Sequence, residues 1–362
     1  MFTPFSFYSK FSVTPPTNTA FEFSVKTDNT GTSNSDQFTL PLTSAFNGIT
    51  AEVDWGDGSS DTITSYNQSE ITHTYASSGT YTISITNALR AFRFANGGDK
   101  LKILNISNWG VFEFTTSQSF FGCNNLTQTA TDSPTISTTD LNGTFANCLN
   151  FNGYINDWDV SNVQDFRFFL SSAVIFNQPL NDWDVSSGTR FTQAFRFAQQ
   201  FNQSLSNWDV SNVTNMESMF YAATVYNQSL ASWDVSSVIS MNQMFRFANS
   251  VTNINIGNWN MSSVTNVYGM LRDCDNFDES LANWDINQIV TFGDFLRSSD
   301  GLSTANYDAT LEGWAAQVPL SYSGTLNMGN SVKTLGGAAE AAFNTIETNS
   351  GGAGAIDILD GN

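Results

Sequence analysis

The sequence predicts a fold of mixed β and α/β class, with a small β-domain, a long repeat solenoid and a terminal cap. Three observations predict it. Tryptophan recurs at spacings of 25, 25, 25, 26 and 25 residues, alternating apolar and polar residues fill residues 19–88, and the repeat stops near residue 300. A 25-residue unit is too small to bury its own apolar face, so successive units must stack and align equivalent side chains in columns.

Four segments follow from these patterns. We expect an N-terminal arm at residues 1–18, a β-sandwich at 19–88, the solenoid at 89–299 and a C-terminal cap at 300–362. The recurring tryptophans of the solenoid are Trp158, Trp183, Trp208, Trp233, Trp259 and Trp284.

The arm mixes prolines and aromatic residues with polar ones and contains no continuous apolar run of signal-peptide or membrane-helix length. We therefore expect no Sec-type leader and no membrane insertion, and we interpret the arm as an attachment peptide. Release by lysis on a virus particle, export by another route or removal of a leader would each bring such a protein to an outer surface.

The β-domain is predicted from period-two alternation. Strands are expected within residues 20–27, 36–42, 49–63 and 71–87, which are separated by Gly, Asn, Ser and Pro turns. An antiparallel arrangement follows from these short connections.

Each solenoid rung changes its period part-way. In residues 205–220, Trp208 and Val210 are two apart, as in a strand, whereas Val213, Met216 and Met219 are three apart, as in a helix. One strand and one helical turn per rung is leucine-rich-repeat geometry. A second apolar column extends the register to about eight rungs through Phe121, Phe145, Leu170, Phe195, Phe220, Phe245, Leu271 and Leu296.

The cap departs from the repeat, as a segment covering the last open core must. We expect helices within residues 306–318 and 336–349, and short strands within 323–329 and 355–359.

The net charge of the chain limits the classes of molecule that we expect it to bind. The 33 acidic residues outnumber the 13 basic ones and give a formal net charge of −20, which argues against nucleic acid and anionic lipid. Cations, neutral glycans and basic protein patches are better partners.

Three cysteines occur in similar repeat contexts at Cys123, Cys148 and Cys274. Cys274 lies too many rungs away to be bonded to the others. Cys123 and Cys148 lie on neighbouring rungs and leave a disulfide open, although buried free thiols are the simpler interpretation.

Polar columns should line the exposed sheet face, because the tryptophan and valine of each W-D-V-S segment point inward. Two interpretations stay open: the carboxylates accept local hydrogen bonds that shape a turn, or they form a face that holds Ca²⁺ or glycan hydroxyls. The candidate ligand-binding residues of this face are Asp157, Asp159, Asp182, Asp184, Asp209, Asp234, Asp285, Ser186, Ser211 and Ser236.

Another surface column follows the Phe/Leu position. It forms a candidate contact stripe of Arg196, Tyr221, Arg246, Arg272 and Arg297. Pairing with carboxylates or stacking on neighbouring rings would make it structural, whereas Arg and Tyr are also enriched at protein contact sites.

A column of asparagines, Asn177, Asn202 and Asn227, recurs with the repeat and includes Asn-x-Ser triplets. We expect an internal ladder that bonds backbone groups and not a set of glycosylation sites.

The N-terminal domain contains one further cluster. Asp54, Asp57 and Asp61 surround a Gly-Asp-Gly-Ser turn. A tight turn is the main interpretation, and a peripheral Ca²⁺ site is the alternative.

Catalytic signals are missing from the sequence. The single histidine, His73, lies in a strand pattern where we expect it to pack, and no nucleophile elbow, P-loop or zinc-protease motif occurs. Paired carboxylates for glycoside hydrolysis stay open, but identical repeated columns do not provide two different carboxyl environments. We therefore expect a non-enzymatic protein.

The repeat unit FNQSLSNWDVSNVTNMESMF resembles the 25-residue repeat of the BspA-like leucine-rich-repeat surface proteins, or Mycoplasma lipoprotein-type repeats. Similarly, VDWGDGSSDTI with ITHTYASSGTYTISITN resembles a PKD-type domain. The resemblance implies a PKD-like β-sandwich, then a leucine-rich-repeat-like solenoid of about eight rungs and a C-terminal cap. It also implies an adhesive, host-contacting surface protein without catalytic residues.

The functional hypothesis is a non-enzymatic adhesion or recognition protein at a virion surface or in the extracellular space. We expect a bacteriophage component, namely a tail fibre, head fibre or decoration protein, that binds a host-surface glycan or protein and contacts other virion proteins through its arm. A BspA-like bacterial adhesin and a purely structural decoration protein are the alternatives.

Overall fold

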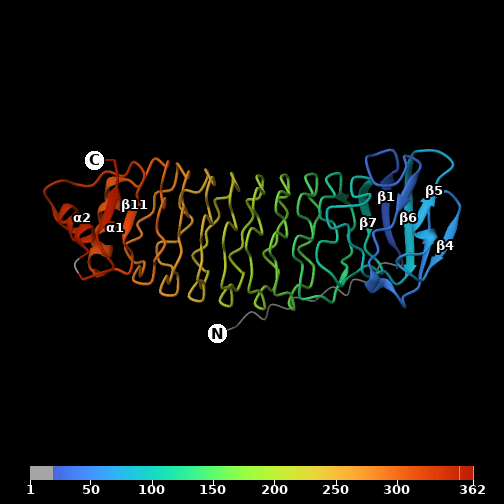
Figure 1. Cartoon of the computed structure of the whole chain (residues 1–362), viewed down its shortest axis with the longest axis horizontal. Coiled ribbons are helices and arrows are strands. Elements are labelled where there is room, and N and C mark those ends of the chain that lie inside the picture. The colour runs from blue at the N-terminus through green and yellow to red at the C-terminus, as the bar shows by residue number, and fades with distance from the viewer. Residues whose placement is uncertain (1–18, 350, 362) are drawn as a thin grey trace, which may run out of the picture.

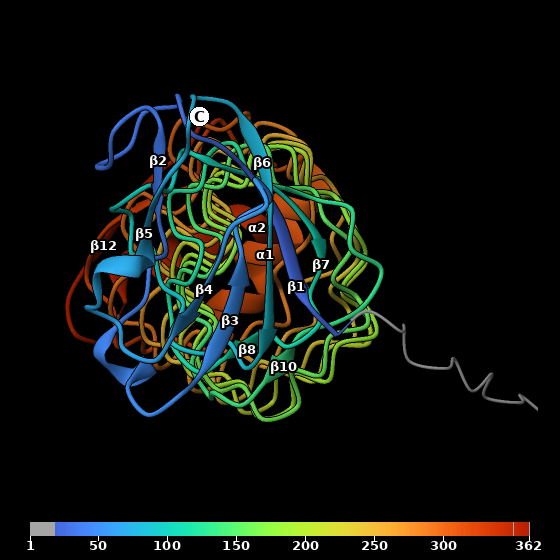
Figure 2. The same ribbon diagram turned by 90° about the vertical axis from the view of Figure 1, so that its right-hand side faces the viewer.

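The computed structural model describes residues 19–349 and 351–361, so the predicted arm at residues 1–18 lies outside the described residues. The molecule is elongated: a strand-rich end, a stack of rungs and a helical end follow one another in chain order (Figure 1). Viewed from its N-terminal end, the rungs lie behind one another (Figure 2).

The N-terminal strands lie within the four predicted segments. They are β1 (Phe21–Lys26), β2 (Gln37–Thr39), β3 (Ala51–Asp54), β4 (Ser60–Ile63), β5 (Thr72–Thr74) and β6 (Thr80–Asn87). Two 3-10 helices, η1 (Ser44–Phe46) and η2 (Ser69–Ile71), interrupt them. Every second residue of β1 faces the core, and β1 pairs antiparallel with β6.

The predicted PKD-like β-sandwich is wrong. The main sheet has six strands in the order β4-β3-β6-β1-β7-β9, and β2 pairs separately with β5. The repeats supply β7 (Ile103–Asn108) and β9 (Thr127–Gln128). The sheet therefore continues across residue 88, because the second edge of β1 pairs antiparallel with β7. Alternation identified the strands but not their partners.

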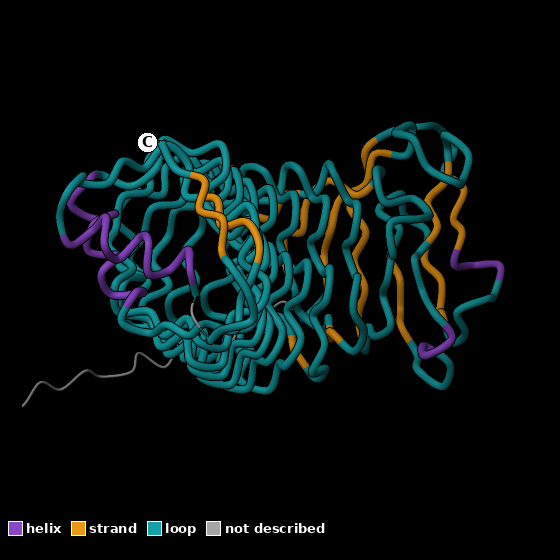
Figure 3. The backbone as a smooth tube through the Cα atoms, turned by 60° about the vertical axis from the view of Figure 1, so that its left-hand side comes forward, coloured by secondary structure: helices purple, strands orange, loops and turns teal. Residues whose placement is uncertain are grey.

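The repeats contain much less regular structure than the sequence predicts. After the short parallel pair of β8 (Glu113–Phe114) and β10 (Thr135–Ile136), residues 137–303 form neither a helix nor a strand. Single parallel bridges join successive rungs, from Asp140–Asp165 to Asn266–Thr291. The rungs are accordingly drawn as loops in Figure 3. The predicted leucine-rich-repeat-like solenoid, with one strand and one helical turn per rung, is therefore wrong.

A run of turns takes the place of the predicted helix. In residues 166–173, alternate N–H groups bond to the next rung, whereas those between them bond three residues back. The bonds to the next rung are Phe166 to Arg190, Phe168 to Thr192, Leu170 to Ala194 and Ser172 to Arg196, at 2.9, 3.0, 2.9 and 2.7 Å. The bonds within the rung are Phe169 to Phe166, Ser171 to Phe168 and Ala173 to Leu170, at 3.2, 3.1 and 3.0 Å.

Backbone conformation explains why the pattern imitates a helix. Phe168 and Ser172 have positive φ of 55° and 61°, and the equivalent residues of the other rungs repeat this conformation. Turns of this kind keep buried side chains three and four residues apart, as in a helix, but point half of the N–H groups along the stack. The apolar period alone does not distinguish the two arrangements.

Inward columns form the core of the stack, as predicted. Trp208 is stacked 6.4 Å from Trp183 and 6.5 Å from Trp233, and its indole N–H donates to the Leu180 carbonyl at 2.8 Å. In the second column the predicted member Phe121 is wrong: Phe120 is the fully buried residue that stacks on Phe145, at 5.7 Å. Phe121 occupies the next, outer position and is only half-buried.

The bonding of the asparagine ladder to backbone groups is confirmed, but its predicted internal position is wrong, because the ladder lies on the surface. The Asn177 side-chain oxygen accepts the Asn202 N–H at 3.0 Å, and the Asn202 oxygen accepts the Asn227 N–H at 2.9 Å. Asn177 and Asn227 are exposed. The ladder therefore ties the rungs together from outside.

The three cysteines are buried and free, which decides between the two interpretations of these residues. The Cys148 and Cys274 thiols approach the carbonyls of Phe120 and Phe245 at 3.0 and 2.9 Å. Burial raises the pKa of all three thiols and keeps them protonated.

The C-terminal helices and strands lie in the predicted segments, except that the first helix begins two residues before residue 306. They are α1 (Thr304–Ala315), β11 (Gly324–Asn327), α2 (Ala338–Thr348) and β12 (Ile356–Leu359), with β11 and β12 parallel. Helix α1 continues the tryptophan column, because the Trp314 indole N–H donates to the Leu281 carbonyl at 2.9 Å. The helix thus covers the open end of the repeat core.

Candidate functional site

The predicted Asp/Ser columns lie along one edge of the stack, on irregular backbone and not on a sheet. In four successive rungs an exposed aspartate separates the buried tryptophan from a buried valine, as Asp209 does between Trp208 and Val210. The inward and outward directions inferred from the sequence are therefore confirmed, although the sheet that suggested them is absent from these rungs.

Each of these aspartates closes a turn with the residue two positions later. The Asp184 Oδ1 atom accepts the Ser186 N–H at 3.0 Å and its hydroxyl at 2.6 Å. Asp159 with Ser161 and Asp209 with Ser211 repeat the pattern, while Asp234 accepts the Ser236 N–H and Asp285 accepts from Asn287. The turn-shaping interpretation is thus supported for one oxygen of each carboxylate.

These hydrogen bonds also favour the charged form. The serine hydroxyl and N–H lower the pKa of the Asp159, Asp184 and Asp234 carboxyls, and they outweigh the opposing effect of burial. The neighbouring charge of Asp184 opposes the shift at Asp159. These three carboxylates therefore stay ionised in mild acid.

The column that precedes the tryptophan links neighbouring rungs. The Asn156 amide donates to Asp182 of the next rung at 2.6 Å, whereas the Tyr154 hydroxyl donates to Asp157 within its own rung at 3.2 Å. A hollow of about 350 Å³ opens between adjacent rungs; Asp182, Asp184, Asn207 and Asp209 contribute to its lining. The structure thus brings three of the predicted ligand-binding residues, Asp182, Asp184 and Asp209, around one depression.

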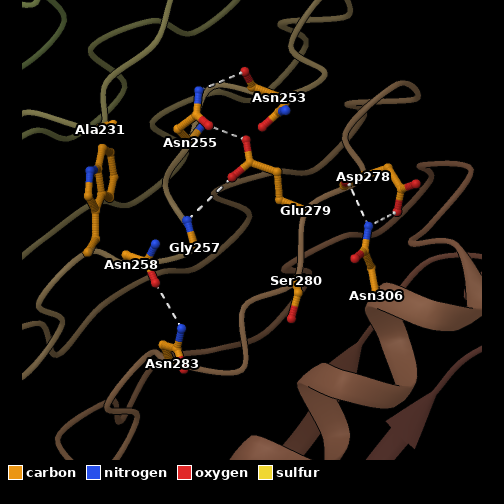
Figure 4. A pocket seen from close by; sticks show the side chains of 11 residues that line it. Ala231, Asn253, Asn255, Gly257, Asn258, Asp278, Glu279, Ser280, Asn283 and Asn306 are labelled. Carbon is orange, nitrogen blue, oxygen red and sulfur yellow. Dashed lines mark hydrogen bonds between the residues drawn. The ribbon is translucent and has the colours of Figure 1, made fainter.

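A larger depression lies where the repeats meet helix α1. This polar groove has a volume of about 550 Å³, and carboxamide and carboxylate side chains line most of it (Figure 4). Its residues are Ala231, Asn253, Asn255, Gly257, Asn258, Trp259, Asp278, Glu279, Ser280, Asn283 and Asn306.

Glu279 organises the polar groove. The residue is 9% exposed, and its carboxylate accepts the N–H groups of Asn255, Ile256 and Gly257 at 2.7, 2.8 and 3.3 Å. The rung that follows Val251 contains one extra residue, and Asn255 takes a positive φ of 62° there. Glu279 thus satisfies the backbone donors that this insertion exposes.

Asp278 joins the groove to the cap. Its carboxylate accepts the Asn306 amide at 2.9 Å and the Ser303 N–H at 2.8 Å, at the start of α1. These two hydrogen bonds lower the pKa of the Asp278 carboxyl against the opposing effect of its burial. Figure 4 shows Asp278 and Asn306 at the side of the groove nearest the helix.

The predicted contact stripe forms a continuous surface column with two halves. Arg196 and Arg246 lie on opposite sides of Tyr221, with guanidinium carbons 5.0 and 5.8 Å from its ring centre. Arg272 and Arg297 pair instead with Asp294, at 2.8 and 3.3 Å. Stacking alone holds Arg196, stacking and an ion pair with Asp273 hold Arg246, and ion pairs hold Arg272 and Arg297.

The N-terminal aspartates do not converge. Asp54 accepts the Gly56 N–H, Asp61 accepts the Trp55 indole N–H at 2.8 Å, and Asp57 faces His73 at 2.9 Å. Burial raises the pKa of the Asp57 carboxyl, but hydrogen bonds from Ser59 and His73 outweigh it and bring the pKa to about 2. In residues 19–349 and 351–361 no group of three His, Cys, Asp or Glu side chains suits a metal ion.

His73 packs as the sequence suggests, although it is half-buried. Its ring stacks on Trp55 at 4.8 Å and meets the edge of Tyr75 at 4.5 Å. With Asp57 it completes a small polar contact at the end of the domain.

Sequence reasoning missed Glu279 and the polar groove. The signal was the single 26-residue spacing, between Trp233 and Trp259, which places an extra residue in this rung. A second pocket, beside Arg196, was not predicted either. The sequence feature that could have predicted this pocket is the occurrence of small residues, in place of Arg or Tyr, in the contact-stripe column.

Comparison with known proteins identifies the repeats. Residues 86–208 and 189–309 match the family described as "Mycoplasma protein of unknown function, DUF285". The chain belongs to this family. The two matched ranges overlap and together cover more than half of the chain, including all rungs that carry the Asp columns. Neither the curated proteins nor the solved structures contain a match.

The family match covers the repeats and not the N-terminal strands, so neither a leucine-rich repeat nor a PKD-type domain is confirmed by it. Among the residues that the structure describes, no helix is both long and apolar enough to cross a membrane.

Proposed function

We propose that this protein is a non-enzymatic recognition protein, and that the Asp-bearing edge of its repeat stack binds a glycan on a cell surface. One observation carries the proposal. Asp159, Asp184, Asp209, Asp234 and Asp285 each use Oδ1 in a turn, while Oδ2 has no hydrogen-bond partner among the described residues. The turns fix the carboxylates and leave one acceptor of each available to a ligand.

The chemistry suits a ligand rich in hydroxyl groups. A carboxylate oxygen accepts a sugar O–H, and the carboxamides of the hollow and the polar groove can donate or accept. Weak contacts repeated on successive rungs would add through avidity on a polymer. This edge gives no reason to invoke a chemical reaction.

Calcium is an optional part of this proposal. Ca²⁺ needs six to eight oxygen ligands, more than one exposed aspartate supplies. The glycan would therefore have to provide several of them, with the cation held between Asp184, Asp209 and the sugar.

The setting we propose is the surface of a bacteriophage particle, with residues 1–18 as the attachment segment. A bacterial envelope, as in BspA-like surface proteins, and a purely structural decoration role are the competing settings. Immunodetection on purified particles tests this choice: detection on particles supports the phage setting, whereas detection only in a bacterial envelope contradicts it.

Binding should be tested with the full chain, fluorescently labelled, on bacterial cells and their extracted surface polysaccharides, with Ca²⁺ and with chelator. The informative variant is Asp184→Asn with Asp209→Asn. Asn260 shows that asparagine keeps this turn, because its side-chain oxygen accepts the Ser262 N–H at 3.2 Å and its hydroxyl at 2.7 Å. The double variant removes two charges from the hollow and preserves the backbone.

We expect saturable binding that the double variant weakens roughly tenfold, since a hydrogen bond to a charged group contributes about 1.5–3 kcal/mol. Asp54→Asn is the control, because exposed Asp54 also accepts the N–H two residues later but lies in the N-terminal domain, outside the Asp-bearing edge. Equal binding by all three proteins would remove the Asp edge as the binding surface. No binding to any cell or glycan would favour the structural role.

A further inference from the structure

A second pocket interrupts the contact-stripe column. The residues at this repeat position are Phe121, Ala146, Ser171, Arg196, Tyr221, Arg246, Arg272 and Arg297. Two successive small residues, Ala146 and Ser171, thus stand between Phe121 and Arg196. Where the other rungs carry a large side chain, a pocket of about 340 Å³ opens, with Ala146 and Ser171 buried among its lining residues.

Two kinds of side chain surround this Arg196 pocket. Phe121 and Phe168, which line it, are half-buried and expose part of their rings. Carboxamides from Gln118, Asn142 and Gln193 complete much of the remaining lining. Small-molecule sites commonly combine apolar walls with a few polar groups in this way, at volumes from about 300 Å³ upward.

Arg196 differs from the other arginines of the chain. Within the part that the structure describes, its guanidinium forms neither a hydrogen bond nor an ion pair. The other seven arginines, Arg90, Arg93, Arg167, Arg190, Arg246, Arg272 and Arg297, all donate to a carboxylate, carboxamide or carbonyl oxygen.

The unpaired guanidinium is nevertheless held in place. Its central carbon lies 4.4 Å from the Phe197 ring centre and 5.0 Å from that of Tyr221. Stacking leaves the N–H groups at the guanidinium edge available, and these donors match a carboxylate in a two-point contact. A fixed cation at the rim of a concave pocket indicates a site for an anion.

We propose that the Arg196 pocket binds a saccharide unit that carries one carboxylate, of the uronic-acid class. Arg196 pairs with the carboxylate, the Phe121 and Phe168 rings contact the C–H face of the sugar, and the carboxamides bind its hydroxyls. A single cation matches a single carboxylate. The chain has a net charge of −20, which opposes the approach of a dense polyanion or a highly acidic peptide.

This inference goes beyond the proposed function, because it assigns a charged ligand to a different surface. The Arg196 pocket shares no lining residue with the polar groove or with the hollow that Asp184 and Asp209 line. The Asp184→Asn, Asp209→Asn variant should therefore bind an acidic sugar normally, and failure of one proposal can be distinguished from failure of the other.

The test uses the full chain and a short glucose oligosaccharide that carries a single glucuronic acid unit, with the corresponding neutral glucose oligosaccharide as the ligand control, in titration calorimetry. Arg196→Gln removes the cation. Ser171→Arg fills the gap with the residue that the same repeat position carries in other rungs. Arg246→Gln is the matched protein control, since Arg246 also stacks on Tyr221 but already pairs with Asp273 at 3.4 Å.

We expect the wild type and Arg246→Gln to bind the uronic oligosaccharide equally, and the neutral one at least tenfold more weakly. Arg196→Gln and Ser171→Arg should weaken uronate binding roughly tenfold to a hundredfold, the range for loss of a charge-assisted hydrogen bond. Circular dichroism must show that both variants are folded. Undetectable uronate binding by the wild type, equal binding by Arg196→Gln, or preference for an acidic peptide over the uronate would overturn the proposal.

Discussion

Glu279 in the polar groove and Arg196 in its own pocket both place a charge at the wall of a depression, but their partners differ. Glu279 is 9% exposed and accepts three backbone N–H groups of its own chain. Arg196 is half-buried, rests on two aromatic rings and has no oxygen partner among the described residues. A charged side chain in the wall of a pocket is therefore not assigned to ligand binding by its position. What decides is whether its hydrogen-bond and ion-pair partners belong to the same chain.

This contrast separates two kinds of experimental effect. A charge whose partners lie within the chain should affect the free energy of unfolding when it is removed, because it leaves buried groups unsatisfied. A charge without such partners should affect ligand binding and leave stability nearly unchanged.

The largest expected effect is at Lys102, an extreme case of internal pairing. Its side chain is fully buried, its ammonium donates to the carbonyls of Asn34 and Gln37 at 2.7 and 2.8 Å, and it lies 4.0 Å from buried Asp99. Lys102→Met would leave Asp99 without its cation, so we expect a loss of about 3–5 kcal/mol in urea unfolding.

Lys26→Met is the control for this experiment. Lys26 is 46% exposed and lies 3.6 Å from Asp28, which is also exposed, so its replacement should cost at most about 1 kcal/mol. Equal losses of unfolding free energy for Lys102→Met and Lys26→Met would show that pairing within the chain does not determine how much stability is lost.

Glu279→Ala tests the groove itself. The substitution leaves the N–H groups of Asn255, Ile256 and Gly257 without their acceptor, and we expect a loss of about 2 kcal/mol in urea unfolding. Glu279→Gln retains one acceptor oxygen and should lose less. Glu217→Ala is a suitable control, because Glu217 accepts a single long bond of 3.4 Å from Asn242. If Glu279→Ala were as stable as the wild type, the Glu279 carboxylate would not be required for the fold, and ligand binding would become the better explanation of its position.

The buried columns of the fold were predictable from the sequence, whereas its hydrogen bonding was not. The tryptophan period identified the inward residues, and the helical patterns located α1 and α2. The turn run was hidden because Phe168 and Ser172 adopt positive φ without being glycine. Side-chain periodicity reports which residues are buried, not whether an N–H group bonds within its rung or to the next.

The candidate sites were predictable in composition but not in shape. The sequence located the Asp and Arg columns, yet it could not show that Ala146 and Ser171 open a pocket beside Arg196. It assigned Phe121 to the core, and this one-residue error concealed an aromatic wall of that pocket. Glu279 was hidden because its partners are main-chain groups, whose positions depend on an inserted residue.

Asp57 provides an intermediate case and a pH test. Its carboxylate is 23% exposed, faces His73 at 2.9 Å and has a pKa of about 2. The folded pKa lies below the unfolded value, so this stabilisation is complete above about pH 4 and is lost as pH falls toward 2. Thermal unfolding should show Asp57→Asn less stable than the wild type by about 1 kcal/mol at pH 6. A difference that persisted at pH 2 would contradict this assignment.

The smallest expected effect is that of Arg196→Gln on stability. The substitution removes the stacking of a guanidinium on Phe197 and Tyr221, which contributes about 0.5 kcal/mol at a partly exposed site, and it leaves no buried oxygen unsatisfied. Urea unfolding should therefore nearly coincide with that of the wild type, while uronate binding weakens at least roughly tenfold. If Arg196→Gln instead lost as much unfolding free energy as Glu279→Ala, Arg196 would be needed to stabilise the fold. The presence or absence of partners within the chain would then no longer distinguish the two pockets.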